Sequence, residues 1–125
     1  MESRPSKDDY FLAMARLVAS RSTCLHRHVG AVLVKDGHVL STGYNGAPRG
    51  EPHCLDVGCA KPEHAIRMED CRAVHAEINA IIQAALHGVS IMGATLYCSC
   101  RPCVMCSRAL KNAGIEDIVW SDEYE

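Results

Sequence analysis

Hydrophobic residues recur with two different periods along the chain, and the changes of period mark the expected elements. Between residues 8 and 21 they fall every three or four positions, which predicts an amphipathic helix. The apolar positions of this helix are Phe11, Leu12, Ala15, Val18 and Ala19. The apolar segments 29–34 and 38–44 flank Asp36-Gly37, and this pattern predicts a β-hairpin that turns at the dipeptide.

The second half of the chain alternates between helix and strand patterns. A stretch rich in turn-forming residues runs from residue 45 to about residue 70. Helices are predicted over 73–87 and 102–112, each followed closely by a glycine, and strands over 93–99 and 115–120. The order α-β-β-α-β-α-β predicts one α/β domain, residues 1–125, whose mixed sheet is covered by helices on both faces.

Composition and charge narrow the class of protein. With 48% hydrophobic and 22% charged residues, the chain has the composition of an ordinary globular protein. Its net charge of −2 argues against a broad nucleic-acid-binding surface. The N-terminus lacks the apolar core of a secretion signal, and no apolar run approaches the length of a membrane span. We therefore expect a cytoplasmic protein, in which the eight cysteines are metal ligands or reactive thiols rather than disulfides.

Four of the eight cysteines fall within residues 98–106, CSCRPCVMC. Cys103 and Cys106 lie on one face at the predicted start of a helix, where the helix dipole favours thiolate. Taken alone, this pair fits a thioredoxin-like dithiol or half of a structural zinc site. His75 lies in the first turn of the preceding helix, and one histidine with two cysteines would give three zinc ligands and an open fourth position. Glu77 would then be free for proton transfer, with a solvated or capping carboxylate as the alternative.

The other two cysteines of this segment have a different expected role. Cys98 and Cys100 are two apart on or just after a strand, so their side chains face the same side of the sheet. Small buried hydrophobic residues are the favoured interpretation. Their closeness to the predicted zinc ligands keeps ligand exchange and oxidation open.

The spacing of the histidine, glutamate and cysteines reproduces the zinc nucleobase-deaminase signature H-x-E…P-C-x-x-C, in which Pro102 precedes the cysteine pair. The same chain contains STCLHRHVGAVLV, STGYNGAPRG, HCLDVGC, CRAVHAEINAIIQAALHG and GATLYC. With these segments it resembles, over nearly its whole length, the deoxycytidylate (dCMP) deaminase family of the cytidine deaminase superfamily. The resemblance implies a three-layer α/β/α fold with a five-stranded mixed sheet, hydrolysis of dCMP to dUMP and ammonia, and assembly as a hexamer or dimer.

The resemblance also implies roles for particular residues. His75, Cys103 and Cys106 would hold a catalytic Zn2+, which lowers the pKa of its bound water so that hydroxide attacks C4 of cytosine. Glu77 would shuttle the proton to N3 and then to the departing amino group. Substrate contacts are expected from Asn45 (sugar and base), Arg49 and Arg27 (5′-phosphate), Ala76, and Tyr124 (stacking on cytosine). From the residues alone, Asn45 fits a simple turn equally well, and either arginine fits a solvated surface charge.

Some members of the family carry a second, structural zinc in the long irregular stretch. Here the expected ligands are Cys24, Cys54, Cys59 and Cys71, with His53 or His64 as substitutes. Buried or free thiols are the alternative for these cysteines. A metal would offset the ordering cost of a loop that lacks a core of its own.

Two features depart from the family pattern. Arg101 follows Cys100 where relatives usually carry small or acidic residues, and this difference leaves substrate choice or a phosphate contact open. The chain also stops at Glu125, directly after the fourth predicted strand. Either the fold or the chain is then shortened, or an oligomeric partner covers the exposed strand edge.

Three functions follow from these patterns. The leading one is dCMP deamination, with dCTP and dTTP as candidate effectors by resemblance. The second is deamination of cytidine, deoxycytidine, guanine or a tRNA adenosine, the last disfavoured by the net charge of −2. The third is a non-catalytic zinc or thiol-redox protein, which would not require Glu77.

Overall fold

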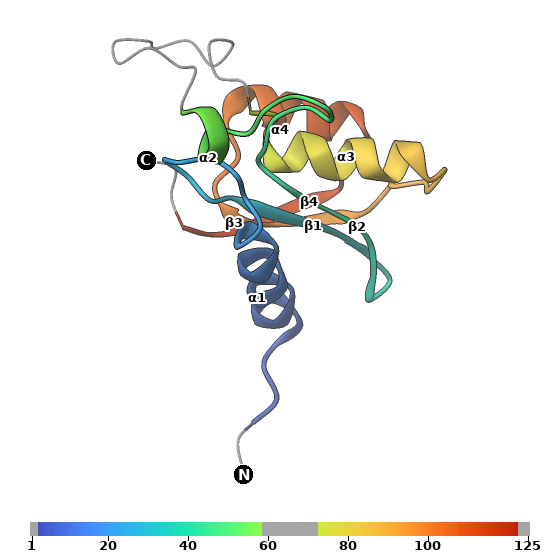
Figure 1. The fold of residues 1–125 in the computed structure, drawn as a ribbon. Helices are drawn as coiled ribbons and strands as arrows, with labels where there is room; N and C mark the ends of the chain where they lie inside the picture. The colour runs from blue at the N-terminus through green and yellow to red at the C-terminus, as the bar shows by residue number, and fades with distance from the viewer. Residues whose placement is uncertain (1–2, 59–72, 123–125) are drawn as a thin grey trace.

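The protein folds around a four-stranded mixed sheet with helices on both faces (Figure 1). The structure is a computed structural model that describes residues 3–58 and 73–122. Its elements are α1 (Lys7–Ala19), β1 (Gly30–Lys35), β2 (His38–Tyr44), α2 (Cys54–Val57), α3 (Ala76–Leu86), β3 (Thr95–Cys100), α4 (Val104–Asn112) and β4 (Asp117–Asp122). The strand order is β2-β1-β3-β4, with β1 antiparallel to both neighbours and β3 parallel to β4. The predicted α/β fold with a mixed, helix-covered sheet is confirmed.

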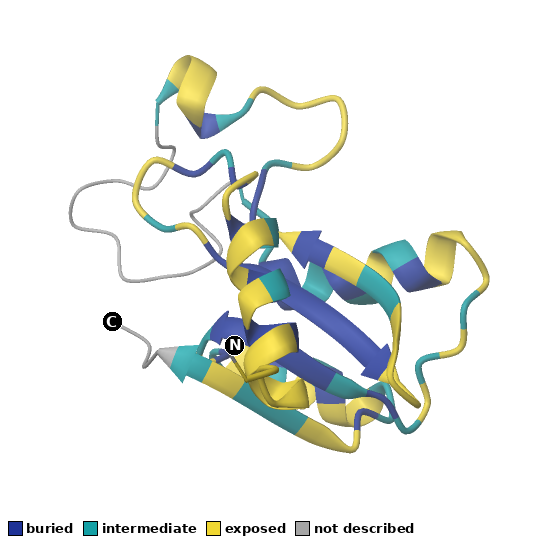
Figure 2. Cartoon of the chain, turned by 90° about the horizontal axis from the view of Figure 1, so that it is seen from below, coloured by how far each residue is buried: buried dark blue, intermediate teal, exposed yellow. Residues whose placement is uncertain are grey.

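Alternation along the central strands separates two hydrophobic clusters. Ala31 and Leu33 of β1 pack with Ala80 of α3 and Leu110 of α4 on one face of the sheet. On the other face, Val32 and Val34 pack with residues of α1, among them Phe11 and Ala15. Figure 1 shows α1 on one side of the sheet and α3 with α4 on the other, and Figure 2 shows the central strands buried between them.

Two glycines allow helices to lie directly on the sheet. A Cβ at Gly43 in β2 would overlap the backbone of Ala76 and Ala80, and a Cβ at Gly30 in β1 would overlap the backbone of Ala15 and Ala19. Glycine at these positions therefore permits the close approach of α3 and α1. The contact at Gly43 lies at the first turn of α3, next to the predicted functional residues.

Most element boundaries agree with the sequence pattern within two residues. The hairpin turns at Asp36 and Gly37, whose φ angles of 52° and 77° suit a tight turn between twisted strands. The short helix α2 lies inside the stretch predicted to be irregular. Within the described residues the sheet has four strands, with β4 at one edge, so the fifth strand implied by the resemblance is not among them.

None of the described helices is long and apolar enough to cross a membrane.

Candidate metal centre and active site

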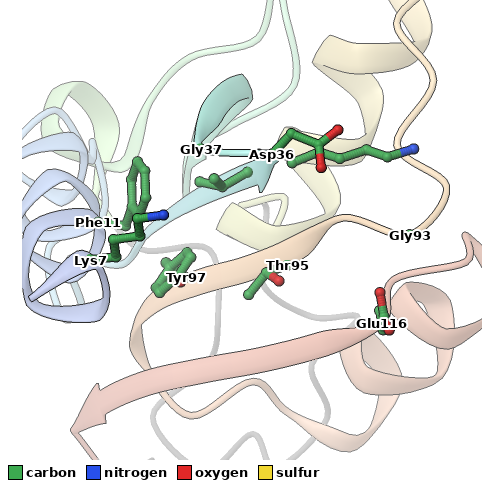
Figure 3. A pocket seen from close by; sticks show the side chains of 10 residues that line it. Lys7, Phe11, Asp36, Gly37, Gly93, Thr95, Tyr97 and Glu116 are labelled. Carbon is green, nitrogen blue, oxygen red and sulfur yellow. The ribbon is translucent and has the colours of Figure 1, made fainter.

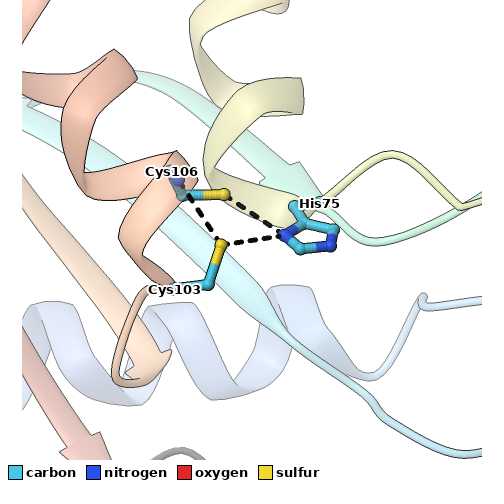
Figure 4. A group of neighbouring side chains, drawn as sticks. All are labelled: His75, Cys103 and Cys106. Atoms are coloured by element: carbon cyan, nitrogen blue, oxygen red, sulfur yellow. Dashed lines mark hydrogen bonds between the residues drawn. The ribbon is translucent and has the colours of Figure 1, made fainter. Parts of the chain in front are cut away.

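The side chains of His75, Cys103 and Cys106 point toward one another from the starts of two helices (Figure 4). His75 Nδ1 lies 3.2 Å from Cys106 Sγ and 3.6 Å from Cys103 Sγ. All three possible ligand atoms lie within 4.8 Å of one another. Within the part of the chain that the structure describes, no other group of three His, Cys, Asp or Glu side chains lies close enough together to hold a metal ion.

All three side chains are positioned by the N-termini of helices. His75 is the N-cap residue of α3, and Cys103 is the N-cap residue of α4. The Cys103 Sγ accepts a hydrogen bond from the backbone N–H of Cys106 at 3.4 Å, which holds the two thiols on one turn. The N-termini of helices carry partial positive charge, so both positions suit an anionic ligand group of a metal ion.

The donor set fits zinc. One imidazole nitrogen and two sulfurs are the ligands that Zn2+ prefers, and three protein ligands leave a fourth tetrahedral position open. Burial raises the pKa of the Cys106 thiol above its ordinary value, and the nearby Glu77 carboxylate adds to the rise. A divalent cation at the three ligand atoms would have the opposite effect, because it stabilises the thiolate.

Glu77 is a buried carboxylate beside the metal centre. It lies in the first turn of α3, two residues after His75, and its side chain is only 4% exposed. This burial argues against the solvated alternative considered from the sequence. A carboxylate so placed, outside the ligand set, is available to accept and return a proton.

The side chain of Asn45 is committed to the backbone of a neighbouring loop. Its Oδ1 accepts a hydrogen bond from the N–H of Val29 at 2.9 Å, and its Nδ2 donates to the carbonyl of Arg27 at 2.9 Å. The residue is 6% exposed. The structure thus gives Asn45 an anchoring role that the sequence did not suggest.

The two arginines proposed for phosphate binding lie in different surroundings. The Arg27 guanidinium donates to Cys100 Sγ at 3.2 Å, beside the end of β3. Arg49 is exposed and lines a cavity of about 730 Å³ with residues of β2 and α3, including Tyr44 and Asn79. The three possible metal ligands are not among the residues that line this cavity.

Two of the four cysteines expected to hold a second zinc lie within the described residues. The backbone N–H of Leu55 donates to the carbonyl of Thr23 at 3.1 Å, so the neighbouring residues Cys24 and Cys54 lie on adjoining segments. Both cysteines are buried. Cys59, Cys71, His64 and the substrate candidate Tyr124 lie outside the described residues. His53 contacts Thr23, with Nδ1 and Oγ1 3.0 Å apart.

A separate cavity of about 400 Å³ lies near the hairpin turn (Figure 3). Lys7 and Phe11 of α1 line it together with Asp36 and Glu116. It contains none of the three metal-site residues, and its charged residues are of both signs.

Comparison with a family model and with known proteins gives matches to deaminases. The family described as "Cytidine and deoxycytidylate deaminase zinc-binding region" matches residues 5–122. A deoxycytidylate deaminase of Schizosaccharomyces pombe is 42% identical over 97% of this chain and 38% of its own length. The deoxycytidylate deaminase of Mycobacterium phage D29 is 41% identical over 97% of this chain and 98% of its own length.

Solved structures agree with this assignment. The dCMP deaminase of cyanophage S-TIM5, in a complex with dCMP and dUMP, has a TM-score of 0.81 and 30% identity over 98% of this chain and 86% of its own. The chain spans about two fifths of the length of the Schizosaccharomyces pombe relative and of the deoxycytidylate deaminase of Saccharomyces cerevisiae, which is also 42% identical. By its sequence and its fold, the chain belongs to the cytidine and deoxycytidylate deaminase family.

Proposed function

We propose that the protein deaminates dCMP to dUMP and ammonia by hydrolysis. The observation that carries this proposal is the three-ligand centre at two helix N-termini with the buried Glu77 beside it. Relatives named deoxycytidylate deaminase support the choice of substrate. A non-catalytic zinc protein would have no use for a buried carboxylate that is not one of the three ligands.

His75, Cys103 and Cys106 would hold the zinc, and the ion would supply a water of lowered pKa at its open position. Glu77 would take a proton from that water and deliver it to N3 of cytosine, which makes C4 more electrophilic. Once the water oxygen has added to C4, the same carboxylate would take the second proton from that oxygen and give it to the amino group, while the C4–N bond breaks and ammonia leaves. Its burial would keep bulk water from this proton path.

The remaining residues would position the nucleotide. Ala76 lies fully buried between His75 and Glu77, where its backbone would border the base. Asn45 would act on the sugar and base with the hydrogen-bonding capacity left beside its two loop contacts. Arg27 and Arg49 would compete as partners of the 5′-phosphate, and Tyr124 would stack on cytosine.

Several features of the whole protein belong to the same proposal. We infer one deaminase domain over residues 1–125, acting as a homo-oligomer that covers exposed strand edges, with dCTP and dTTP as effectors. A cytoplasmic location is supported by the need of the metal centre for reduced thiols. A second, structural zinc held by Cys24, Cys54, Cys59 and Cys71 is supported by the adjoining positions of the first two.

Ammonia release tests the function directly. Purified protein is assayed against dCMP, CMP, deoxycytidine, cytidine and guanine, with zinc counted on the same sample. We expect turnover of dCMP and two zinc ions per chain. Activity confined to an unphosphorylated substrate would remove the phosphate roles of the arginines, and inactivity of folded, zinc-loaded protein on all five would reject the proposal.

A further inference from the structure

Cys100 makes a contact that deaminase chemistry does not require. Its Sγ accepts a hydrogen bond from the Arg27 guanidinium at 3.2 Å. Cys100 ends β3, three residues before Cys103, and packs on the same face of the sheet as Cys98. A guanidinium in contact with a thiol stabilises the thiolate, which is the nucleophilic form.

Buried polar groups hold the backbone that carries this guanidinium. The carbonyl oxygen of Arg27 accepts hydrogen bonds from Ser22 Oγ at 3.2 Å and from Asn45 Nδ2 at 2.9 Å. Ser22 and Asn45 are 4% and 6% exposed. The backbone of Arg27 is therefore anchored in the interior, and its guanidinium extends from there to the half-buried Cys100.

Exposure and a position outside the metal centre together separate Cys100 from the other described cysteines. Cys24, Cys54, Cys98 and Cys106 are buried. Cys103 is partly exposed, as Cys100 is, but its sulfur lies in the metal centre. Among the described cysteines, Cys100 is thus the accessible thiol outside the ligand set.

We propose that Cys100 is a covalent modification site for hydroperoxides and soft electrophiles, activated by Arg27. With a hydroperoxide, the thiolate sulfur attacks one oxygen, an S–O bond forms and the O–O bond breaks. The sulfur loses two electrons to become a sulfenic acid, while the peroxide is reduced and leaves as water or an alcohol after taking a proton. With iodoacetamide, an S–C bond forms and iodide leaves.

The charged and titratable groups around Cys100 support this assignment. The hydrogen bond with Cys98 lowers the pKa of Cys100, the Arg27 guanidinium lowers it further, and burial and the Glu77 carboxylate oppose them, with a net value of about 7. A large share of Cys100 is then thiolate at neutral pH. This reactivity is independent of the substrate that the metal centre takes.

Competitive alkylation tests the site. Zinc-loaded protein is treated with less than one equivalent of iodoacetamide between about pH 6 and pH 9, and the labelled peptides are quantified by mass spectrometry. We expect Cys100 to be labelled first, with a rate that rises through a midpoint near pH 7. Treatment with hydrogen peroxide followed by dimedone is expected to give a dimedone adduct on Cys100 of the wild-type protein. The Cys100→Ser variant is expected to give none.

Two arginine variants distinguish activation of the Cys100 thiol by Arg27 from a general effect of nearby positive charge. Arg27→Met is expected to slow labelling of Cys100 at pH 7 about fivefold to tenfold, because a thiol pKa higher by one unit has about one tenth of the thiolate. Arg101→Met is the matched control, since it removes the same charge from the neighbouring residue, whose guanidinium lies 5.8 Å from the Trp120 ring. We expect it to leave the midpoint within a few tenths of a pH unit.

Three outcomes would overturn the proposal. Faster labelling of any other cysteine in zinc-loaded protein, Cys59 and Cys71 included, would assign the reactive thiol elsewhere. An unchanged pH profile in Arg27→Met, or an equal shift in Arg101→Met, would remove Arg27 as the activating group. The mapping of wild-type protein decides the site even if a variant fails to fold.

Discussion

Glu77 is buried and lies two residues from His75, a possible metal ligand, so replacing it should separate metal binding from catalysis. We expect Glu77→Gln to retain zinc and to lose activity on dCMP about 10²–10⁴-fold, because the amide cannot accept and return the proton. The measurements are kcat from ammonia release and zinc content from the same preparation.

Glu116→Gln is the matched control for that variant. Glu116 is exposed and lines the cavity near the hairpin turn, away from the three possible metal ligands. Its variant should keep full activity. Activity of Glu77→Gln within tenfold of the wild type would rule out the proposed proton path.

Asn45 should matter for stability as well as for substrate binding. Asn45→Ala removes both side-chain hydrogen bonds and leaves the N–H of Val29 and one acceptor site of Arg27 without their partner. We expect the free energy of unfolding to fall by roughly 2–4 kcal/mol. Urea denaturation measures it, with Asn112→Ala as an exposed control, and a loss below about 0.5 kcal/mol would contradict the anchoring role.

The residues of the candidate metal centre were predictable because they occur at short, characteristic spacings in the sequence. His75-x-Glu77 and Cys103-x-x-Cys106 each lie within one helical turn, so local geometry alone brings their side chains near one another. The contact between Arg27 and Cys100 joins residues 73 positions apart. Such a contact depends on how the loop after α1 packs on β3, and no local pattern encodes that.

At the scale of elements, Gly43 sets the distance between α3 and the sheet. Gly43→Ala would push the backbone of Ala76 and Ala80 away from β2, and with it the first turn of α3. We expect a loss of about 1–3 kcal/mol in unfolding free energy from this overpacking. We also expect zinc affinity to fall about tenfold to a hundredfold, because the shift would displace His75.

Gly30→Ala is the control, since it creates a similar clash on the opposite face, against Ala15 and Ala19 of α1. It should cost comparable stability and leave zinc affinity near the wild-type value. Competition with a chromogenic chelator measures that affinity. Equal zinc affinity in Gly43→Ala and Gly30→Ala would show that the seating of α3 does not control the metal centre.

The long elements were predictable and the shortest one was not. Periodic apolar residues in α1 and the alternating faces of the central strands report directly on burial. The helix α2 has four residues, of which only Cys54 is buried, so it has no period to detect. Its position depends on contacts such as that between Leu55 and Thr23, which join distant parts of the chain.

At the scale of the whole molecule, the fold brings the N-termini of α3 and α4 together on one face of the sheet. The three possible ligands lie at the N-termini of α3 and α4, elements separated in the sequence by β3. The combined signature H-x-E…P-C-x-x-C predicted this arrangement, and the resemblance of the whole chain to one family implied it as well. The ligand types alone would not have predicted the arrangement of the helices, because zinc sites with the same ligands occur on unrelated folds.

Zinc stoichiometry should distinguish the two proposed metal sites. Cys103→Ser removes a ligand of the catalytic centre, and we expect the loss of one zinc together with nearly all activity. Cys54→Ser removes a ligand of the proposed structural site, and we expect the loss of the other zinc while the ligands of the catalytic centre stay in place. Because metal binding contributes to folding, its melting temperature should fall by at least about 5 °C, roughly 1–2 kcal/mol for a chain of this size. Metal analysis and thermal unfolding of both variants provide the test, and one zinc per chain in wild-type protein, unchanged in Cys54→Ser, would eliminate the second site while leaving the catalytic one intact.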